Sequence, residues 1–202
     1  LQDLTEFMEE SLGIQLAAND ANNTIPGSVN NIAGESGTLA QGITIQNGKL
    51  RIVSNNGLDN EIDLTLSSFQ VTADTGEISN PNMGFGSIQD AAGESATTDF
   101  VVFDSLGVPV NMRLTLAMES RSGSATTYRW YADSPDNAPT SGTDINVGTG
   151  LVSFDGEGNL ITTTNDTISI DRRNSPAESP LEFQLDFSQV SGLASENSSI
   201  AA

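Results

Sequence analysis

Hydrophobic and polar positions alternate along much of the second half of the chain. Every second residue is apolar between residues 110 and 118, and the same alternation returns between residues 181 and 187. This period of two predicts strands with one face buried and the other face in water. Similar short runs are separated by turn residues roughly every 8 to 12 positions, which favours a β-sandwich or an open barrel.

The first residues of the chain follow a helical spacing instead. Asp3, with Glu6 three positions later, is typical of a capping box, and Gly13 stands where a helix would end. We therefore expect one short amphipathic helix whose apolar stripe packs on the sheet of its own unit. The stripe consists of Leu4, Phe7, Met8 and Leu12.

The strongest hairpin signal in the first half is the pair Asn47-Gly48. Asn and Gly adopt the positive φ values of a type I′ turn, and apolar residues alternate on both sides of this pair. The residues expected to face one another across this hairpin are Ile43, Ile45, Leu50 and Ile52. A further strand is predicted over residues 60–71, with apolar positions at Ile62, Leu64 and Leu66.

Two Asp-Gly turns are expected to fix the register of the later strands. Asp104 suits the first position of a type I turn because its carboxylate accepts nearby backbone N–H groups, and Gly107 suits the closing left-handed position. Asp155 has the same place in a later corner, where Gly156 and Gly158 are available for positive φ. A slip of one residue would turn every buried side chain outward.

These patterns divide the chain into three parts. Residues 1–78 form a small α+β unit with one helix and short strands, residues 79–96 form a connection, and residues 97–202 form an all-β domain. The predicted fold class is mainly β, with a β-sandwich or open-barrel-like domain and a smaller α+β unit that contains one short helix. The connection is rich in Gly, Asn, Ser and Ala, which is typical of a surface segment.

Composition limits the chemistry that this chain can perform. The 202 residues contain no cysteine and no histidine, which excludes disulfides, thiolate metal sites, Ser-His-Asp triads and His-ligated metals. A Ser-Lys nucleophile would have to use Lys49, the only lysine, beside a predicted turn in water. We therefore predict no catalytic residue, no metal and no cofactor, and we expect the chain not to be an enzyme.

The charge of the chain limits its partners. Seven basic and twenty-seven acidic residues give a formal net charge of −20, so the surface would repel a phosphate backbone or an anionic bilayer. Apolar runs approaching the ~20 residues of a membrane span are absent, and the chain lacks the pattern of a cleavable signal. Neither nucleic acid nor membrane is expected as a partner.

Two binding or catalytic alternatives stay open at this stage. The loop around Asp155, Glu157 and Asn159 loosely resembles a calcium loop, although it lacks the later bidentate Glu. A secreted carbohydrate-binding or adhesive β module would present an exposed aromatic platform, and a glycoside-processing enzyme would need two facing carboxylates in a cleft. The candidate aromatics are Tyr128, Trp130 and Tyr131. Arg172-Arg173 is interpreted as a solvated turn.

A succession of motifs resembles the bacterial flagellar hook protein over residues 96 to 195. The motifs are "TTDFVVFDSLGVPVNMRLTLAM", "YRWYAD", "GTGLVSFDGEGNLI" and "LEFQLDFSQVSGLAS". In that family a strand ending in an Asp-Ser-x-Gly turn leads into a long strand, an aromatic strand around a Trp, an F-x-x-x-G turn and a terminal apolar strand. These features correspond to Phe103 to Gly107, Trp130, Phe154 to Gly158 and Phe183 to Phe187.

The resemblance implies a structural role. It implies a subunit of the hook, a curved tube that transmits torque from motor to filament, whose outer domains slide against neighbouring copies. Hook proteins polymerise through terminal helical segments that this sequence does not contain, so we expect a middle portion that is monomeric by itself. Other hook subunits, together with hook cap and junction proteins, are the implied partners. The implied location is extracellular, after export by the flagellar secretion system without a cleavable signal.

Overall fold

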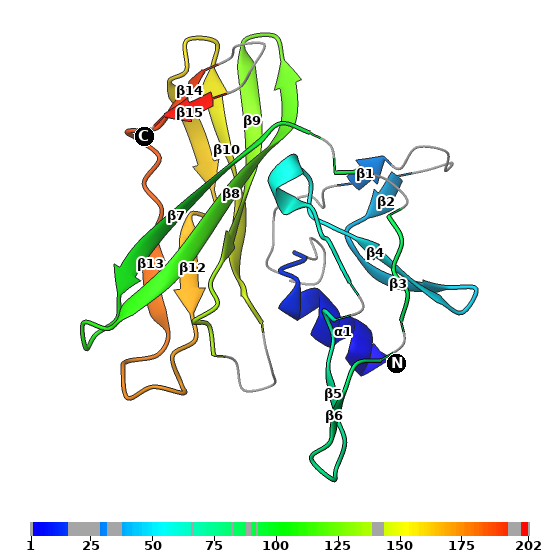
Figure 1. The fold of residues 1–202 in the computed structure, drawn as a ribbon. Helices are drawn as coiled ribbons and strands as arrows, with labels where there is room; N and C mark the ends of the chain where they lie inside the picture. Colours follow the sequence, from blue (N-terminus) through cyan, green and yellow to red (C-terminus); the bar gives the residue numbers. More distant parts are fainter. Residues whose placement is uncertain are drawn as a thin grey trace.

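The protein is mainly β, which confirms the fold class that the sequence predicts. A computed structural model describes residues 2–15, 29–31, 38–65, 67–81, 83–87, 90–91, 93–138, 144–193 and 199–201. Within these ranges the chain forms one α-helix and several antiparallel sheets, none of which closes into a barrel. Figure 1 shows a long twisted sheet with a smaller unit beside it.

The largest element is a five-stranded antiparallel sheet in the order β11-β10-β9-β8-β7. Each strand therefore pairs with its neighbour in sequence; short turns join β7 to β8, β8 to β9 and β10 to β11, whereas residues 134–145 join β9 to β10. Its strands are β7 (Ser95–Phe103), β8 (Pro109–Ser122), β9 (Ala125–Asp133), β10 (Asn146–Asp155) and β11 (Leu160–Thr164). Strands β7 and β11 are the two edges of this sheet.

One face of the sheet carries the main hydrophobic core. A second, two-stranded sheet of β12 (Thr167–Ile170) and β13 (Leu181–Gln184) covers this face through Ile168 and Ile170, both fully buried. The core residues of the large sheet are Val110, Met112, Leu114, Leu116, Tyr128, Trp130, Ala132, Val147, Val152 and Phe154. Their period of two is the one that the sequence displays, so this face follows directly from the pattern.

Trp130 occupies the centre of that core because β10 leaves room for its ring. Gly150 lies opposite Trp130 in the β9–β10 register, and Gly148 lies two positions away on the same strand. A Cβ atom on Gly150 would come within 2.5 Å of the Trp130 Nε1, and one on Gly148 within 3.3 Å of the ring carbons. Glycine is thus required here for close approach to the indole.

The helix α1 (Gln2–Ser11) packs against the hairpin of β3 (Gly42–Gln46) and β4 (Lys49–Val53). Met8, Ile14 and Ile43 are buried between them, and a residue with φ of +68°, Gly13, follows the helix. Two details of the prediction are wrong. Asp3 lies in the first turn and not at the cap, and 43% of Phe7 is exposed because it falls at the edge of the buried stripe.

The β3–β4 register pairs Ile43 with Ile52 and Ile45 with Leu50. The strand predicted over residues 60–71 is wrong for the described residues 60–65 and 67–70, which form no sheet pairs, and Leu66 lies outside the described residues. Ile62 and Leu64 are nevertheless half-buried while their neighbours are exposed, and Ile62 packs on the helix cluster. The alternation therefore reflects burial on one side of an extended segment that has no hydrogen-bonding neighbour.

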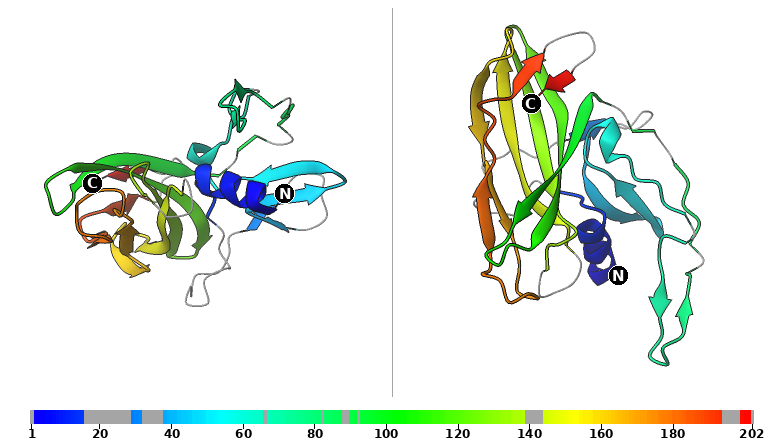
Figure 2. Two further views of the ribbon diagram at one scale, coloured as in Figure 1. Left: turned by 90° about the horizontal axis from the view of Figure 1, so that it is seen from below. Right: turned by 60° about the vertical axis from the view of Figure 1, so that its left-hand side comes forward.

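Short elements complete the described chain. A 3₁₀ turn, η1 (Leu58–Asn60), follows β4, and three two-stranded pairs lie around the two units (Figure 2). These pairs are β1 (Val29–Asn31) with β2 (Thr38–Ala40), β5 (Val71–Thr72) with β6 (Ile78–Ser79), and β14 (Ser191–Leu193) with β15 (Ser199–Ala201). Among the described residues, no helix is long and apolar enough to cross a membrane.

The second face of the sheet is not wet along its whole length, which corrects the prediction made for β8. Thr115, Ala117, Arg129 and Tyr131 alternate with the core residues and are almost fully buried. The N-terminal unit covers this face: the side-chain amide of Gln41 donates a hydrogen bond of 2.9 Å to the Tyr131 hydroxyl. The middle of β8 and β9 is therefore enclosed from both sides.

Backbone contacts join the two units at the end of α1. The N–H of Ile145 donates to the Glu10 carbonyl at 3.2 Å, and the Asn146 side chain donates to the Ile14 carbonyl at 3.2 Å. Gly13 lies so close to Asp133 that a Cβ atom would sit 3.2 Å from its carboxylate. The C-terminal end of a helix dipole is negative, so this end faces a carboxylate of like sign.

Burial raises the pKa of Asp133 to about 7, with Arg113 opposing the increase and Asp144 adding to it. Desolvation also raises the pKa of Asp144, and it raises the pKa of Glu10 together with the charges of Asp144 and neighbouring helix acids. The junction thus gathers carboxyl groups that favour their neutral form.

We expect the free energy of unfolding to fall as the pH rises from about 5 to 8. The pKa of Asp133 is about 7 in the folded chain and about 3.9 when unfolded, so above pH 5 the unfolded state has lost the proton, whereas the folded state loses it only as the pH passes about 7. The free energy of unfolding should decrease by on the order of 1–3 kcal/mol over this range, and Asp133→Asn should abolish the decrease. Urea unfolding at each pH measures the change.

Asp186→Asn is the matched control for this prediction. The N–H of Ser188 lowers the pKa of Asp186, so its contribution changes only at more acidic pH. This variant should keep the slope between pH 5 and 8. An Asp133→Asn chain with an unchanged slope would contradict the assignment.

Candidate contact surface

An exposed apolar patch marks the end of the β7–β8 hairpin. Its four side chains are exposed by 46% to 64% of their surface. We call them the apolar tip: Val101, Phe103, Leu106 and Val108. Large apolar side chains gathered at an edge strand are typical of a surface that contacts another protein.

The backbone of the apolar tip is held by Asp104. Its Oδ1 accepts the N–H groups of Leu106 and Val108, both at 3.0 Å, and its backbone N–H donates to the Val108 carbonyl. Gly107 closes the turn with φ of +78° and nothing lies within 4 Å of a Cβ built there. Glycine is needed at this position for its conformation alone.

A buried ion pair ties the same turn to a distant loop. Arg172 donates from Nη2 to Asp104 Oδ2 at 3.1 Å and from Nη1 to the Asp136 carbonyl at 3.0 Å. The N–H of Val108, then that of Leu106, and the Arg172 guanidinium lower the pKa of Asp104. The interpretation of Arg172 as part of a solvated turn is therefore wrong, whereas Arg173 is exposed and pairs with Asp171.

The β10–β11 turn repeats the design of the β7–β8 turn. Asp155 Oδ1 accepts the N–H groups of Glu157 at 2.9 Å and Asn159 at 2.8 Å, and φ of Gly158 is +87°. Gly156 does not have a positive φ. Gly158 also accepts the N–H of Gly192 on β14, so a Cβ there would lie 2.5 Å from the Gly192 oxygen.

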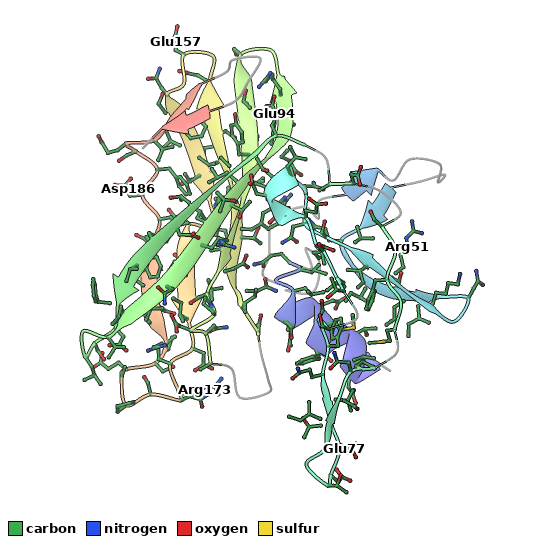
Figure 3. All side chains as sticks on the ribbon, viewed as in Figure 1. Arg51, Glu77, Glu94, Glu157, Arg173 and Asp186 are labelled. Carbon is green, nitrogen blue, oxygen red and sulfur yellow. The ribbon has the colours of Figure 1, made fainter. Side chains whose placement is uncertain are left out.

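The third predicted turn lies in the other unit. Asn47 and Gly48 have φ of +52° and +75°, as a type I′ turn requires. The structure does not bring the three turns together: two lie at opposite ends of the large sheet, and the third ends the β3–β4 hairpin (Figures 1 and 3). They are corners of the fold and do not form one site.

The residues that the carbohydrate-binding and calcium-binding alternatives require are not available for binding. Tyr128, Trp130 and Tyr131 are each at most 2% exposed, so they cannot stack on a sugar ring. The side-chain amide of Asn159 and two backbone N–H groups already occupy the Asp155 carboxylate, and they lower its pKa. In the described ranges, no group of three or more acidic side chains is placed to hold a metal ion.

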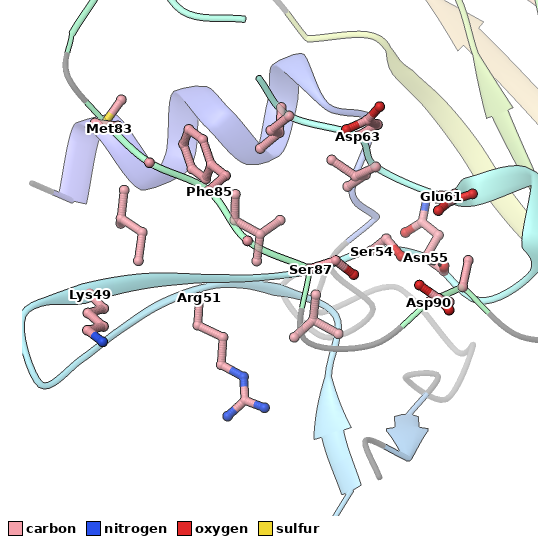
Figure 4. Close-up of a pocket in the computed structure, with 18 of the residues that line it drawn as sticks. Lys49, Arg51, Ser54, Asn55, Glu61, Asp63, Met83, Phe85, Ser87 and Asp90 are labelled. Atoms are coloured by element: carbon pink, nitrogen blue, oxygen red, sulfur yellow. Dashed lines mark hydrogen bonds between the residues drawn. The ribbon is translucent and has the colours of Figure 1, made fainter. Parts of the chain in front are cut away.

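A cleft of about 1040 Å³ lies in the smaller unit, between the β3–β4 hairpin and residues 61–64 and 83–87 (Figure 4). Its acidic lining residues are Glu61, Asp63 and Asp90. Asp133, whose pKa is raised to about 7, does not line it but lies at the junction with the sheet.

Fold and surface together are those of a structural β protein with an exposed and firmly held apolar tip. The family of the flagellar basal body protein FlaE D2 domain matches residues 72–202, and the chain belongs to this family of flagellar hook proteins. The family is structural and not a family of enzymes, and its members associate with other hook subunits in the flagellar hook. Neither a curated protein nor a solved structure matches the chain.

Two functional features were missed by sequence reasoning. The burial of Arg172 has no periodic signal, because it depends on a loop that returns to Asp104 from 68 residues away. The exposure of Phe103 could have been suspected, because it alternates with Val102 and Phe100 next to a turn at a sheet edge. Periodicity assigns faces to a strand but does not say which strand is the edge.

We expect Arg172→Met to lower the melting temperature by roughly 5 °C or more. The substitution leaves the Asp104 carboxylate without its cation and also removes the hydrogen bond to the Asp136 carbonyl. Calorimetry would measure the change. The adjacent Arg173→Met serves as control and should change the melting temperature little, because Arg173 is exposed; equal losses would contradict the role of Arg172.

The glycines of the two Asp turns should differ in their response to substitution. Gly107→Ala should cost roughly 1–2 kcal/mol from positive φ alone. Gly158→Ala should cost more, because its Cβ also meets the β14 backbone at 2.5 Å. Gly156→Ala, with ordinary φ and its nearest atom at 3.6 Å, is the control. Denaturant unfolding of the three variants tests this order.

Proposed function

We propose that this chain supplies outer domains of the flagellar hook, and that the apolar tip contacts a neighbouring subunit while the tube transmits torque. The observation that carries the proposal is the combination of exposure and rigidity at the tip. Phe103 is 64% exposed, yet the turn that follows it is fixed by the buried pair of Asp104 with Arg172. A flexible loop would collapse onto the domain, whereas a fixed apolar tip stays available.

A small contact of this kind suits subunits that slide past one another. Each protofilament of a bent rotating tube must lengthen and shorten, so its outer contacts have to shift without separating. Four apolar side chains bury far less surface than the roughly 1,200–2,000 Å² typical of a stable interface. Each domain is then stiff, because its sheet is enclosed from both sides. The contacts between domains are small and can shift as the tube bends.

The division of labour along the chain follows from the same proposal. We assign residues 97–202 as the hook-type β domain, residues 79–96 as the connection, and residues 1–78 as an additional lobe. The family match begins at residue 72 and so includes part of that lobe. Hook cap and junction proteins would be further partners, met after export to the cell exterior by the flagellar secretion system.

The test is a substitution of the apolar tip in the gene that encodes the chain. Cells with Phe103→Ser and Leu106→Ser should export the subunit and assemble hooks, but their hooks should bend poorly and swimming speed should fall. Both changes are at exposed positions, so the fold should persist. Electron microscopy of hooks and tracking of cells are the measurements.

Ile161→Ser is the matched control for this experiment. Ile161 is 55% exposed on β11, the opposite edge of the same sheet. Cells with this change should swim normally. Normal swimming of cells with the double substitution at the tip would remove the proposal.

A further inference from the structure

Almost every basic side chain of this acidic protein is already committed to a contact within the chain. Five of the seven form ion pairs with an acid among the described residues, and their distances include 2.9 Å for Arg113 with Asp99. The arginines of these pairs are Arg113, Arg121, Arg129, Arg172 and Arg173. Arg51 is buried and has an interaction of its own.

Lys49 is the exception. It is exposed beside the Asn47-Gly48 turn, and within the part of the chain that the structure describes its side chain has neither an ion pair nor a hydrogen bond. Ile45, on the paired strand of the same hairpin, is 46% exposed. We call Lys49 and Ile45 the hairpin end. In the β3–β4 register Lys49 pairs with Gln46 and Ile45 with Leu50, so the hairpin end presents a cation on one face and an apolar side chain on the other.

The apolar tip has the complementary composition. The N–H of Glu178 donates to Ser105 Oγ at 2.8 Å, which places this exposed acid beside the tip. Nearby Arg172 and Arg173 are held by Asp104 and Asp171. Among the described residues, Glu178 therefore has no ion-pair partner and leaves a net negative charge next to exposed apolar side chains.

We infer that the hairpin end of one copy docks on the apolar tip of a second copy, with Lys49 facing Glu178. This inference rests on the proposed function, since it names the partner of the same tip. With a net charge of −20, two copies repel each other unless a cation is placed at their contact. Lys49 is the one cation that the described chain leaves available for this purpose.

The position of the two surfaces fits a contact that can be repeated. The β7–β8 hairpin and the β3–β4 hairpin project on opposite sides of the molecule, so one copy cannot satisfy both with its own side chains (Figure 1). When the hairpin end of one copy binds the apolar tip of another, the pair still has one free hairpin end and one free apolar tip. Such head-to-tail contacts build rings and helical tubes, as a hook requires.

A carbodiimide cross-link on the whole chain tests this contact. The reagent condenses an amine with a carboxylate that lies against it, and Lys49 is the only lysine in the chain. Concentrated protein made from equal parts of ¹⁴N- and ¹⁵N-labelled chains should give a mixed-isotope Lys49–Glu178 peptide by mass spectrometry. We expect about tenfold more of it than of Lys49–Glu157, and less at ~1 M salt because of screening.

Matched variants complete the experiment. Glu178→Gln should abolish the product, Glu157→Gln at the far end of the sheet should not, and Phe103→Ser should reduce it (Figure 3). The doubly reversed chain with Lys49→Glu and Glu178→Lys should regain a cross-link between the same two positions. The inference would be overturned if the Lys49–Glu178 cross-link formed only within single copies. It would also be overturned if Lys49 were cross-linked to all the acidic residues in similar amounts.

The outcome is separable from that of the proposed function. If substitution of the tip impairs hook bending but the chain gives no Lys49–Glu178 product, only the inferred hairpin contact is overturned. A specific product together with normal swimming of the tip variants would instead retain the contact and remove its mechanical role.

Discussion

The enclosure of β8 and β9 from both sides is the constraint on which the rest of the structure depends. One face buries Trp130 and its apolar neighbours under β12 and β13, so the hydrophobic effect holds the sheet together. The other face buries Arg129 and Tyr131 under the N-terminal unit, where hydrogen bonds and an ion pair with Glu119 satisfy them. Because both faces are occupied, a change of register would disrupt two interfaces at once.

The two interfaces differ in chemistry and therefore in their response to conditions. Burial of apolar surface depends little on pH, whereas the junction at the end of α1 contains Asp133, whose pKa is raised to about 7. Lowered pKa values at Asp104 and Asp155 act in the opposite direction, because their turns bind the ionised carboxylate. Acid thus favours the attachment of the N-terminal unit until the turns begin to lose their acceptors.

Sequence reasoning succeeded where one physical effect determines the pattern. The alternation of Val110, Met112 and Leu114 predicts the core face, because a strand presents every second residue to the same side. It failed where a second element decides the outcome. The burial of Arg129 needs the N-terminal unit, that of Arg172 needs the β7–β8 turn at Asp104, and residues 60–65 alternate without a strand to pair with. Local periodicity has no access to these long-range partners.

The same reasoning supports the proposal that a surface, and not a pocket, carries the function of this protein. A chain without histidine or cysteine has few groups for chemistry near neutral pH, and it uses five of its seven cations to pair acids of its own fold. Internal pairing stiffens the turns, above all at Asp104, but it leaves the outside strongly negative. In the proposed contact, copies of this chain meet over a small apolar area with Lys49 at its edge. Strong bonds within the subunit and weak ones between subunits are what a tube needs to bend without breaking.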